Sequence, residues 1–463
     1  MVSVGLFNRV LVEKYDQPGP RYTSYPTAPH FHEGFTQANY IDAVNLSHAK
    51  GSCAPLSLYI HVPFCESLCY YCACNKIITQ KRARADEYLR YLKQEIALQG
   101  ALFNPKRPLR QLHFGGGTPT YFDDDQLTDL LSVLAQHFNM QDDPRNEYSI
   151  EVDPRTVTPK RITALRAMGF NRISLGIQDF NPAVQEAVNR LQSYESTQTM
   201  LEAARLAQFK SISFDLIYGL PKQTNASFEQ TLDQVIALKP DRIAAYSYAH
   251  LPTRVRAQRL IRPEDMPPPE RKLELLELTI NKLTQAGYVY IGMDHFALPT
   301  DELAIAQEDG SLQRNFQGYS TQAECDLVAL GVSAIGFIAG SYSQNVKTLK
   351  EYYRALDAQQ LPIERGYTRT IEDQLRARVI HDLMCQGSVD LQRLTEEFGE
   401  HLVNELAFAL SQLGPFIDDG LVTFDGRVVH LQPQGQLMMR NVAMLFDGWL
   451  NRTPEHIRYS RTV

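Results

Sequence analysis

The sequence has no long hydrophobic run, and this absence limits where the protein can reside. No stretch of the 463 residues approaches 18 uncharged apolar residues, which excludes a membrane-spanning helix. The N-terminal residues also lack the apolar core of a secretory signal peptide, because charges at Arg9, Glu13 and Lys14 interrupt them. We therefore expect a cytoplasmic protein with no membrane span.

Two further shortages exclude classes of function. Positive charge is not in excess, and the formal net charge of −7 argues against general nucleic-acid binding. Cysteines are few and odd in number, 7, which argues against a disulfide scaffold in a chain of this size. With 44% hydrophobic residues the chain can still bury a full core, and its length suggests more than one folding unit.

Four of the seven cysteines nevertheless lie within ten residues, in the run HVPFCESLCYYCACN. Cys65, Cys69 and Cys72 have the spacing C-x3-C-x2-C, and Cys74 follows them. Three thiolates on a short loop can hold three irons of a 4Fe-4S cluster and leave the fourth iron without a protein ligand. Such an iron can bind a small molecule and give it an electron, which indicates a reaction centre rather than a simple electron carrier.

Other metal sites fit these cysteines less well. Zinc usually requires four ligands, commonly C-x2-C paired with a second C-x2-C or with two histidines. The remaining cysteines, Cys53, Cys325 and Cys385, are isolated in the sequence. A ferredoxin-type cluster would require a fourth cysteine further along the chain. A zinc-binding scaffold therefore stays as an alternative, and it predicts a colourless protein.

Short apolar runs alternate with helical patterns between about residues 58 and 296. In residues 126–138, for example, leucines recur on one helical face. Such alternation predicts βαβ units and a parallel sheet. The expected fold class is α/β, a partial (three-quarter) TIM-like β/α barrel. The strand-like runs are residues 57–62, 110–116, 147–154, 171–180, 211–221, 241–251 and 288–297.

The segments on either side differ in character. Residues 1–40 form an irregular arm whose GPRYTSYPT segment is expected to pack near the active site, and residues 41–367 would form the barrel domain. After these, three helical patterns and a hairpin around Asp425-Gly426 predict a small helical, winged-helix-like domain over residues 368–463. Because this region has acidic residues and no basic stripe, we expect a lid or docking domain rather than a DNA-binding one.

Polar and glycine residues gather at the ends of the predicted strands. Gly115–Gly117 follow the second strand and Glu151 ends the third. Glycines allow a ligand to approach the backbone, although a tight turn explains them about as well. Gln178, Arg190 and Asp215 lie at or beyond later strand ends, where each is as easily a cap or a surface ion pair. Barrels of this class place their chemistry on this rim.

The cysteine run followed by the glycine triplet resembles the radical S-adenosylmethionine superfamily. A closer likeness is to the oxygen-independent coproporphyrinogen III oxidases, the anaerobic dehydrogenases of haem synthesis. The likeness runs from about residue 15 to the C-terminus and is strongest between residues 57 and 335. It rests on GPRYTSYPT, YIHVPFCESLCYYCACNKI, HFGGGTPTY, SIEVDPR, LGIQDFN, VNR, DLIYGLPKQT, YAHLP, GMDHFA and RNFQGYSTQ.

The resemblance implies a reaction and its cofactors. Cys65, Cys69 and Cys72 would hold a 4Fe-4S cluster whose fourth iron binds S-adenosylmethionine, and reductive cleavage would give a 5′-deoxyadenosyl radical. The radical would take a hydrogen from a propionate of coproporphyrinogen III, and loss of CO2 and one electron would leave a vinyl group. Two propionates would react to give protoporphyrinogen IX. An electron donor and an electron acceptor would be further partners, and a monomer is the expected state.

The resemblance also implies binding residues for two molecules of S-adenosylmethionine. Gln317 and Arg21 are weaker candidates for contact with the substrate. Contacts to the first molecule would come from Tyr59, Gly116, Glu151 and Ile335, and contacts to the second from Tyr71, Gly117, Thr118, Gln178, Arg190, Asp215 and Ala249.

One position departs from the family pattern. Ala73 stands where the family usually has glycine, and because alanine adds only a methyl group, cluster binding is expected to survive. Cys74 is not expected to bind iron. The alternative function is that of a related radical-SAM-like haem chaperone. Cys74, the GPRYTSYPT arm and RNFQGYSTQ favour the dehydrogenase, because a chaperone would usually lack them.

Overall fold

The computed structural model describes residues 5–49, 54–322, 325–452 and 459–462, so Cys53 lies outside the described residues. The chain forms two compact units. We call residues 32–275 and 324–368 the barrel unit. Residues 1–31, 276–323 and 369–463 form the second unit.

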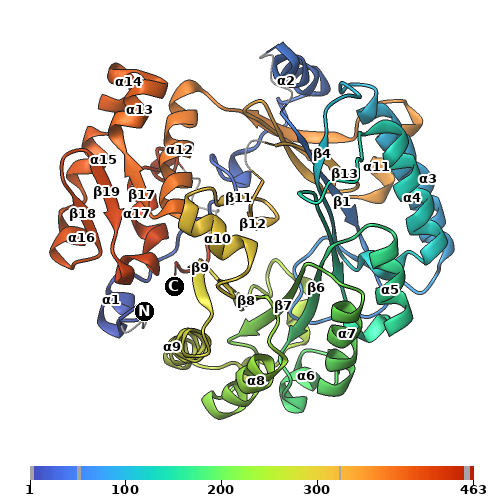
Figure 1. Cartoon of the computed structure of the whole chain (residues 1–463), viewed down its shortest axis with the longest axis horizontal. Coiled ribbons are helices and arrows are strands. Elements are labelled where there is room, and N and C mark those ends of the chain that lie inside the picture. Colours follow the sequence, from blue (N-terminus) through green and yellow to red (C-terminus); the bar gives the residue numbers. More distant parts are fainter. Residues whose placement is uncertain (1–4, 50–53, 323–324, 453–458, 463) are drawn as a thin grey trace. The chain divides into compact units, whose positions relative to one another are not determined.

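A sheet of mainly parallel strands forms the centre of the barrel unit (Figure 1). Strands β13, β1, β4, β5, β6, β7 and β8 are parallel neighbours in that order, and β14, β15 and β16 extend the sheet antiparallel beyond β13. The bounds are β1 (Leu56–Val62), β4 (Leu109–Gly116), β5 (Glu147–Val152), β6 (Arg172–Gln178), β7 (Ser211–Tyr218), β8 (Arg242–Ser247), β13 (Asp326–Leu330), β14 (Ile335–Ile338), β15 (Ser341–Asn345) and β16 (Ile363–Thr368).

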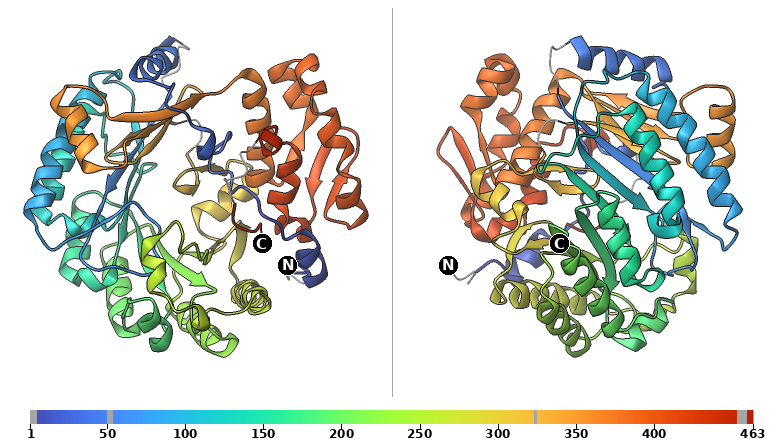
Figure 2. Two further views of the ribbon diagram at one scale, coloured as in Figure 1. Left: turned by 180° about the vertical axis from the view of Figure 1, so that it is seen from behind. Right: turned by 45° about the vertical axis from the view of Figure 1, so that its right-hand side comes forward.

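Helices alternate with these strands and follow one another along one side of the sheet, as Figure 1 and both views of Figure 2 show. This alternation of strand and helix lets each helix bury its apolar face on the sheet. The helices are α2 (Gln37–Ala49), α3 (Ala83–Gly100), α4 (Asp124–His137), α5 (Pro159–Ala167), α6 (Pro182–Ala187), α7 (Tyr194–Leu206), α8 (Asn225–Leu238) and α11 (Leu349–Asp357), and α9 (Pro269–Gln285) contains a boundary between the units.

The sequence prediction holds for the first six strand-like runs, which form β1 and β4–β8. The seventh, residues 288–297, was expected as one strand. It instead forms the antiparallel pair β9 (Val289–Gly292) and β10 (His295–Ala297) in the second unit. The chain reverses because Gly292 and Met293 both have positive φ, 141° and 55°. Strands β13–β16 were not predicted.

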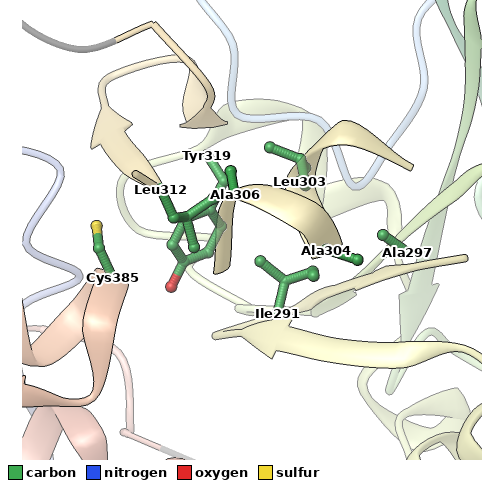
Figure 3. Packing of buried hydrophobic residues seen from close by; sticks show 8 residues of the cluster. All are labelled: Ile291, Ala297, Leu303, Ala304, Ala306, Leu312, Tyr319 and Cys385. Atoms are coloured by element: carbon green, nitrogen blue, oxygen red, sulfur yellow. The ribbon is translucent and has the colours of Figure 1, made fainter. Parts of the chain in front are cut away.

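The core of the second unit contains residues far apart in the sequence (Figure 3). Ile291 of β9 packs with Leu303 of α10 (Glu302–Asp309), Tyr319 of β12 (Gly318–Ser320) and Cys385 of α12 (Ile371–Gln386). The Tyr319 hydroxyl also donates a hydrogen bond to the Met384 carbonyl at 2.9 Å. The isolated Cys385 is therefore a core residue.

The C-terminal part of this unit contains the predicted helices and hairpin. Strands β18 and β19 pair antiparallel on either side of Asp425-Gly426, as expected. The third predicted helix is divided, because the amides of Glu405 and Leu406 bond the carbonyls three residues earlier. The elements are β17 (Ser388–Asp390), α13 (Leu391–Phe398), α14 (Glu400–Asn404), α15 (Ala407–Ser411), α16 (Gly414–Asp418), β18 (Val422–Phe424), β19 (Val428–Leu431) and α17 (Met439–Leu445).

Residues 5–31 of the N-terminal arm belong to the second unit and contact its C-terminal part. They include α1 (Arg9–Tyr15), and the buried Tyr22 donates a hydrogen bond to Asp447 at 2.9 Å. The Arg440 side chain donates to the Pro20 carbonyl at 2.9 Å. Its place near the active site remains a prediction. Strand β11 (Gln313–Asn315), paired with β12, completes the second unit's described strands.

Candidate functional site

A cavity of about 480 Å³ lies in the barrel unit at the carboxyl ends of the parallel strands. Its walls come from the loop after β1 and from the ends of β4, β5 and β6, with further residues from β7 and β8. In parallel strands these ends meet at one edge, which is why residues distant in sequence share the cavity. Of the predicted site residues, those lining it are Cys65, Cys69, Tyr71, Cys72, Gly116, Gly117, Thr118, Glu151, Gln178, Arg190 and Asp215.

The loop that carries the cysteines is held at both ends. Short parallel strands β2 (Phe64–Cys65) and β3 (Ile77–Ile78) pair at its base. Near its middle, the Tyr70 amide donates to the Val188 carbonyl at 3.0 Å. Toward its end, the Lys76 ammonium group donates to the Cys72 carbonyl at 2.6 Å. The loop is thus held by protein contacts alone, from both backbone and side-chain donors.

The thiols sit in a polar and partly cationic environment. The Thr118 hydroxyl donates to the Cys65 sulfur at 3.4 Å. A hydrogen bond with Cys74, which also lines the cavity, and the nearby charge of Lys76 lower the pKa of the Cys72 thiol. Burial raises the pKa of Cys65 to about 11. Lowering the Cys72 pKa favours its thiolate, the form that binds metals.

Two arginines face the Cys69 sulfur. Arg155 and Arg190 place guanidinium nitrogens 3.5 Å and 3.6 Å from Sγ. Both also pair with Asp153, at 2.7 Å and 3.1 Å, and Arg190 donates to the Gly176 carbonyl at 2.6 Å. Sequence reasoning missed Asp153 and Arg155 as site residues. The signal was present, because they follow Glu151 by two and four residues, at the end of the third predicted strand.

The glycine triplet is required for packing, and it also lets a ligand approach the backbone. A Cβ atom on Gly117 would lie 2.7–2.9 Å from backbone atoms of Pro63 and Phe64. A Cβ atom on Gly116, where φ is 113°, would lie 2.7 Å from the His61 ring. The triplet therefore lets the end of β4 lie directly against the start of the cysteine loop.

Two carboxylates in the cavity have opposite protonation tendencies. Burial alone would raise the pKa of Glu151, but hydrogen bonds from His113 and the Gly116 amide, both 3.2 Å, lower it overall. Burial raises the pKa of Asp215 to about 7, although Ser174 donates to it at 2.9 Å. Glu151 is therefore ionised at neutral pH, whereas Asp215 is near its midpoint.

Five predicted residues do not line this cavity. Tyr59 stacks on His113, with ring centroids 5.8 Å apart, and Ile335 begins β14 opposite Gln344. The Ala249 carbonyl accepts a hydrogen bond from Gln258.

The other two, Arg21 and Gln317, belong to the second unit. Arg21 forms an ion pair with Asp294. The backbone N–H of Gln317 donates to the Asn315 side chain at 2.9 Å, and the side-chain Oε1 of Gln317 is buried without a hydrogen-bond partner among the described residues.

The donor set fits an iron–sulfur cluster better than a single ion. In the described part of the chain, no three cysteine, histidine or acidic side chains converge as ligands of one metal ion would. A tetrahedral zinc with Zn–S bonds of about 2.3 Å would bring its sulfurs to within about 4 Å of each other. Three soft thiols around one cavity, with arginine donors at one sulfur, suit a larger anionic thiolate cluster.

Among the described helices, none is both long and apolar enough to cross a bilayer.

Comparisons with known proteins agree with this architecture. Residues 59–235 match the Radical SAM superfamily and residues 370–438 match the HemN C-terminal domain. Oxygen-independent coproporphyrinogen III oxidases from Pseudomonas aeruginosa and Escherichia coli are 49% and 46% identical to the chain, over 98% of both partners in each case. The solved structure of the E. coli coproporphyrinogen III oxidase HemN, described as a radical SAM enzyme, superposes with a TM-score of 0.90 at 45% identity. It covers 96% of this chain and 99% of its own. The predicted fold class is thereby confirmed.

Proposed function

The chain belongs to the family of oxygen-independent coproporphyrinogen III oxidases in the radical SAM superfamily, and from this we propose its reaction in detail. It is an oxidoreductase that oxidatively decarboxylates two propionates of coproporphyrinogen III to vinyls, giving protoporphyrinogen IX in haem biosynthesis. The observation that carries this is relatedness over the full length of both chains. The relatives support the dehydrogenase and not the haem-chaperone alternative.

The family implies a 4Fe-4S cluster and S-adenosylmethionine, and we assign the cluster to Cys65, Cys69 and Cys72. These thiols line one cavity, and their loop is already held in place by β2, β3 and Lys76. When bound, the two cofactors supply the 5′-deoxyadenosyl radical that removes a hydrogen from a substrate propionate. Arg155 and Arg190 donate toward Cys69, and such hydrogen bonds stabilise negative charge on a cluster sulfur.

We assign binding residues to two S-adenosylmethionine molecules, as the resemblance implies. Glu151 stays ionised and can accept hydrogen bonds from an ammonium or a ribose. Arg190 can bind a carboxylate, although it would have to share or exchange Asp153 to do so. The first molecule is assigned to Tyr59, Gly116, Glu151 and Ile335, and the second to Tyr71, Gly117, Thr118, Gln178, Arg190, Asp215 and Ala249.

Substrate contacts are assigned to Arg21 and Gln317. The guanidinium of Arg21 is paired with Asp294, so a propionate would compete with that carboxylate. The buried Oε1 of Gln317 lacks a partner among the described residues and can accept a hydrogen bond from a pyrrole N–H.

Each vinyl formed also requires one electron delivered to the cluster and one removed from the substrate, so an electron donor and an electron acceptor must take part.

An anaerobic turnover assay tests this function. Reconstituted protein with an intact 4Fe-4S cluster is supplied with S-adenosylmethionine, a reductant, cell extract as the source of acceptor, and coproporphyrinogen III. Protoporphyrin should form only when S-adenosylmethionine is present, and Cys69→Ser should abolish it. An intact cluster that yields no porphyrin product would contradict the proposal, and a haem titration would then test the chaperone.

A further inference from the structure

The loop after β8 is locally basic in an acidic chain. It contains two short 3-10 helices, Arg256–Leu260 and Pro263–Asp265. From Ala249 to Asp265 it has four arginines against two acidic residues, Glu264 and Asp265, whereas the whole chain has a formal net charge of −7. The positive charge is therefore a property of this loop and not of the surface in general.

The loop has an exposed side and a buried side. Arg256 and Arg259 lie three apart in the first 3-10 helix, where residues at this interval eclipse one another. That helix ends at Leu260, and Arg262 follows in extended backbone; all three arginines are exposed. On the opposite side Gln258 and Ile261 are 2% and 3% exposed. We call the three outward side chains the arginine face.

The inward side of the loop packs directly on the cysteine loop. The Gln258 amide nitrogen donates to the carbonyls of Tyr71 and Ala249, each at 3.0 Å. Ile261 belongs to a buried apolar cluster against which Tyr70 and Tyr71 pack. Both tyrosines lie between Cys69 and Cys72 in the sequence. One layer of side chains thus connects the arginine face to the cysteine loop.

We propose that the arginine face is the docking surface for an acidic one-electron carrier protein that reduces the cluster. The proposal rests on the proposed function, which requires an electron from outside the chain. Because electron transfer slows steeply with distance, the donor must bind where the surface backs onto the cysteines.

The composition of the face fits a protein partner. Arg256 and Arg262 make no ion pair or side-chain hydrogen bond with any residue that the structure describes. Leu251 and Leu260 beside them are 43% and 55% exposed. Arginine is enriched at protein interfaces, and complementary charge accelerates association. A carrier with an acidic surface around its redox centre satisfies both features.

Two charge-matched variants provide the test. Arg256→Glu/Arg262→Glu reverses two of the three charges of the arginine face. Lys106→Glu/Lys210→Glu reverses two exposed positive charges beside the amino ends of β4 and β7, opposite the cavity. Each cluster-loaded protein is mixed in a stopped-flow instrument with a reduced acidic plant-type ferredoxin, at low and at high salt. Bleaching of the cluster absorbance gives the reduction rate.

The arginine variant should be reduced at least about tenfold more slowly than wild type at low salt, and the difference should shrink at high salt. The lysine variant should follow wild type, and both variants should keep their KM for coproporphyrinogen III with dithionite as reductant. Equal ferredoxin rates for the two variants would overturn the proposal. So would a raised KM for coproporphyrinogen III in the arginine variant, since the face would then bind substrate propionates. Failure of dithionite-driven turnover in wild type would instead contradict the proposed function itself.

Discussion

Replacing Asp215 by asparagine should stabilise the protein, and by an amount that depends on pH. Burial raises the pKa of this carboxyl from 3.8 to about 7, with the nearby Glu151 carboxylate adding to the rise. Because the folded-state pKa exceeds the unfolded-state value, the folded protein takes up a proton. Wild-type stability therefore falls as the pH rises from about 4 to about 7 and changes little from this source above that range.

The magnitude follows from the same two values. At 1.36 kcal/mol for each pH unit, the ionised carboxylate costs the folded state up to about 4 kcal/mol above pH 7. Asparagine has nearly the same shape, and its carbonyl still accepts the hydrogen bond from Ser174. The variant removes the charge without opening a cavity, so the full cost of ionisation should be recovered.

Thermal melting of cluster-loaded protein without S-adenosylmethionine measures this effect. The variant should melt close to wild type near pH 4 and roughly 4–7 °C above it at pH 8. Asp42→Asn, at an exposed position on α2, is the control and should show no such trend. A difference that stays constant across this range, or a variant less stable at pH 8, would refute the reasoning. Weaker binding of S-adenosylmethionine should accompany the gain in stability, as expected where a site residue is strained for function.

Three further perturbations have defined outcomes. Gly117→Ala should cost about 1–3 kcal/mol and lower the iron content, because its Cβ meets backbone atoms, whereas Gly414→Ala, with open space around it, should melt and load iron normally. Arg155→Leu removes a donor to the Cys69 sulfur and should make the cluster's reduction potential more negative in an EPR-monitored redox titration; an unchanged potential would contradict that contact. Glu95→Ala leaves three buried donors without their acceptor at about 1–3 kcal/mol each, so the melting temperature should fall by several degrees, and a fall no larger than that of Glu95→Gln would count against this network.

The local parts of the fold and site could be predicted because their signals are local. The strands β1 and β4–β8 are short apolar runs bounded by glycine or polar residues. The spacing of the apolar residues identifies each strand, and the glycine or polar residues mark its ends. Strand β13 pairs with β1 across about 270 residues of sequence, and no local pattern indicates that pairing. The 288–297 run has the same apolar character as a strand, but the positive φ at Gly292 and Met293 makes it a hairpin.

What the sequence determined by itself was the chemistry, and what the tertiary structure decided was its surroundings. The cysteine spacing and the glycine triplet depend on residues a few positions apart, so they can be read along the chain. That Arg155 and Arg190 face Cys69, and that Gln258 supports Tyr71, depends on strand ends meeting at one edge of a sheet. Only folding brings those ends together, because β-sheet neighbours are set by long-range pairing rather than by sequence proximity.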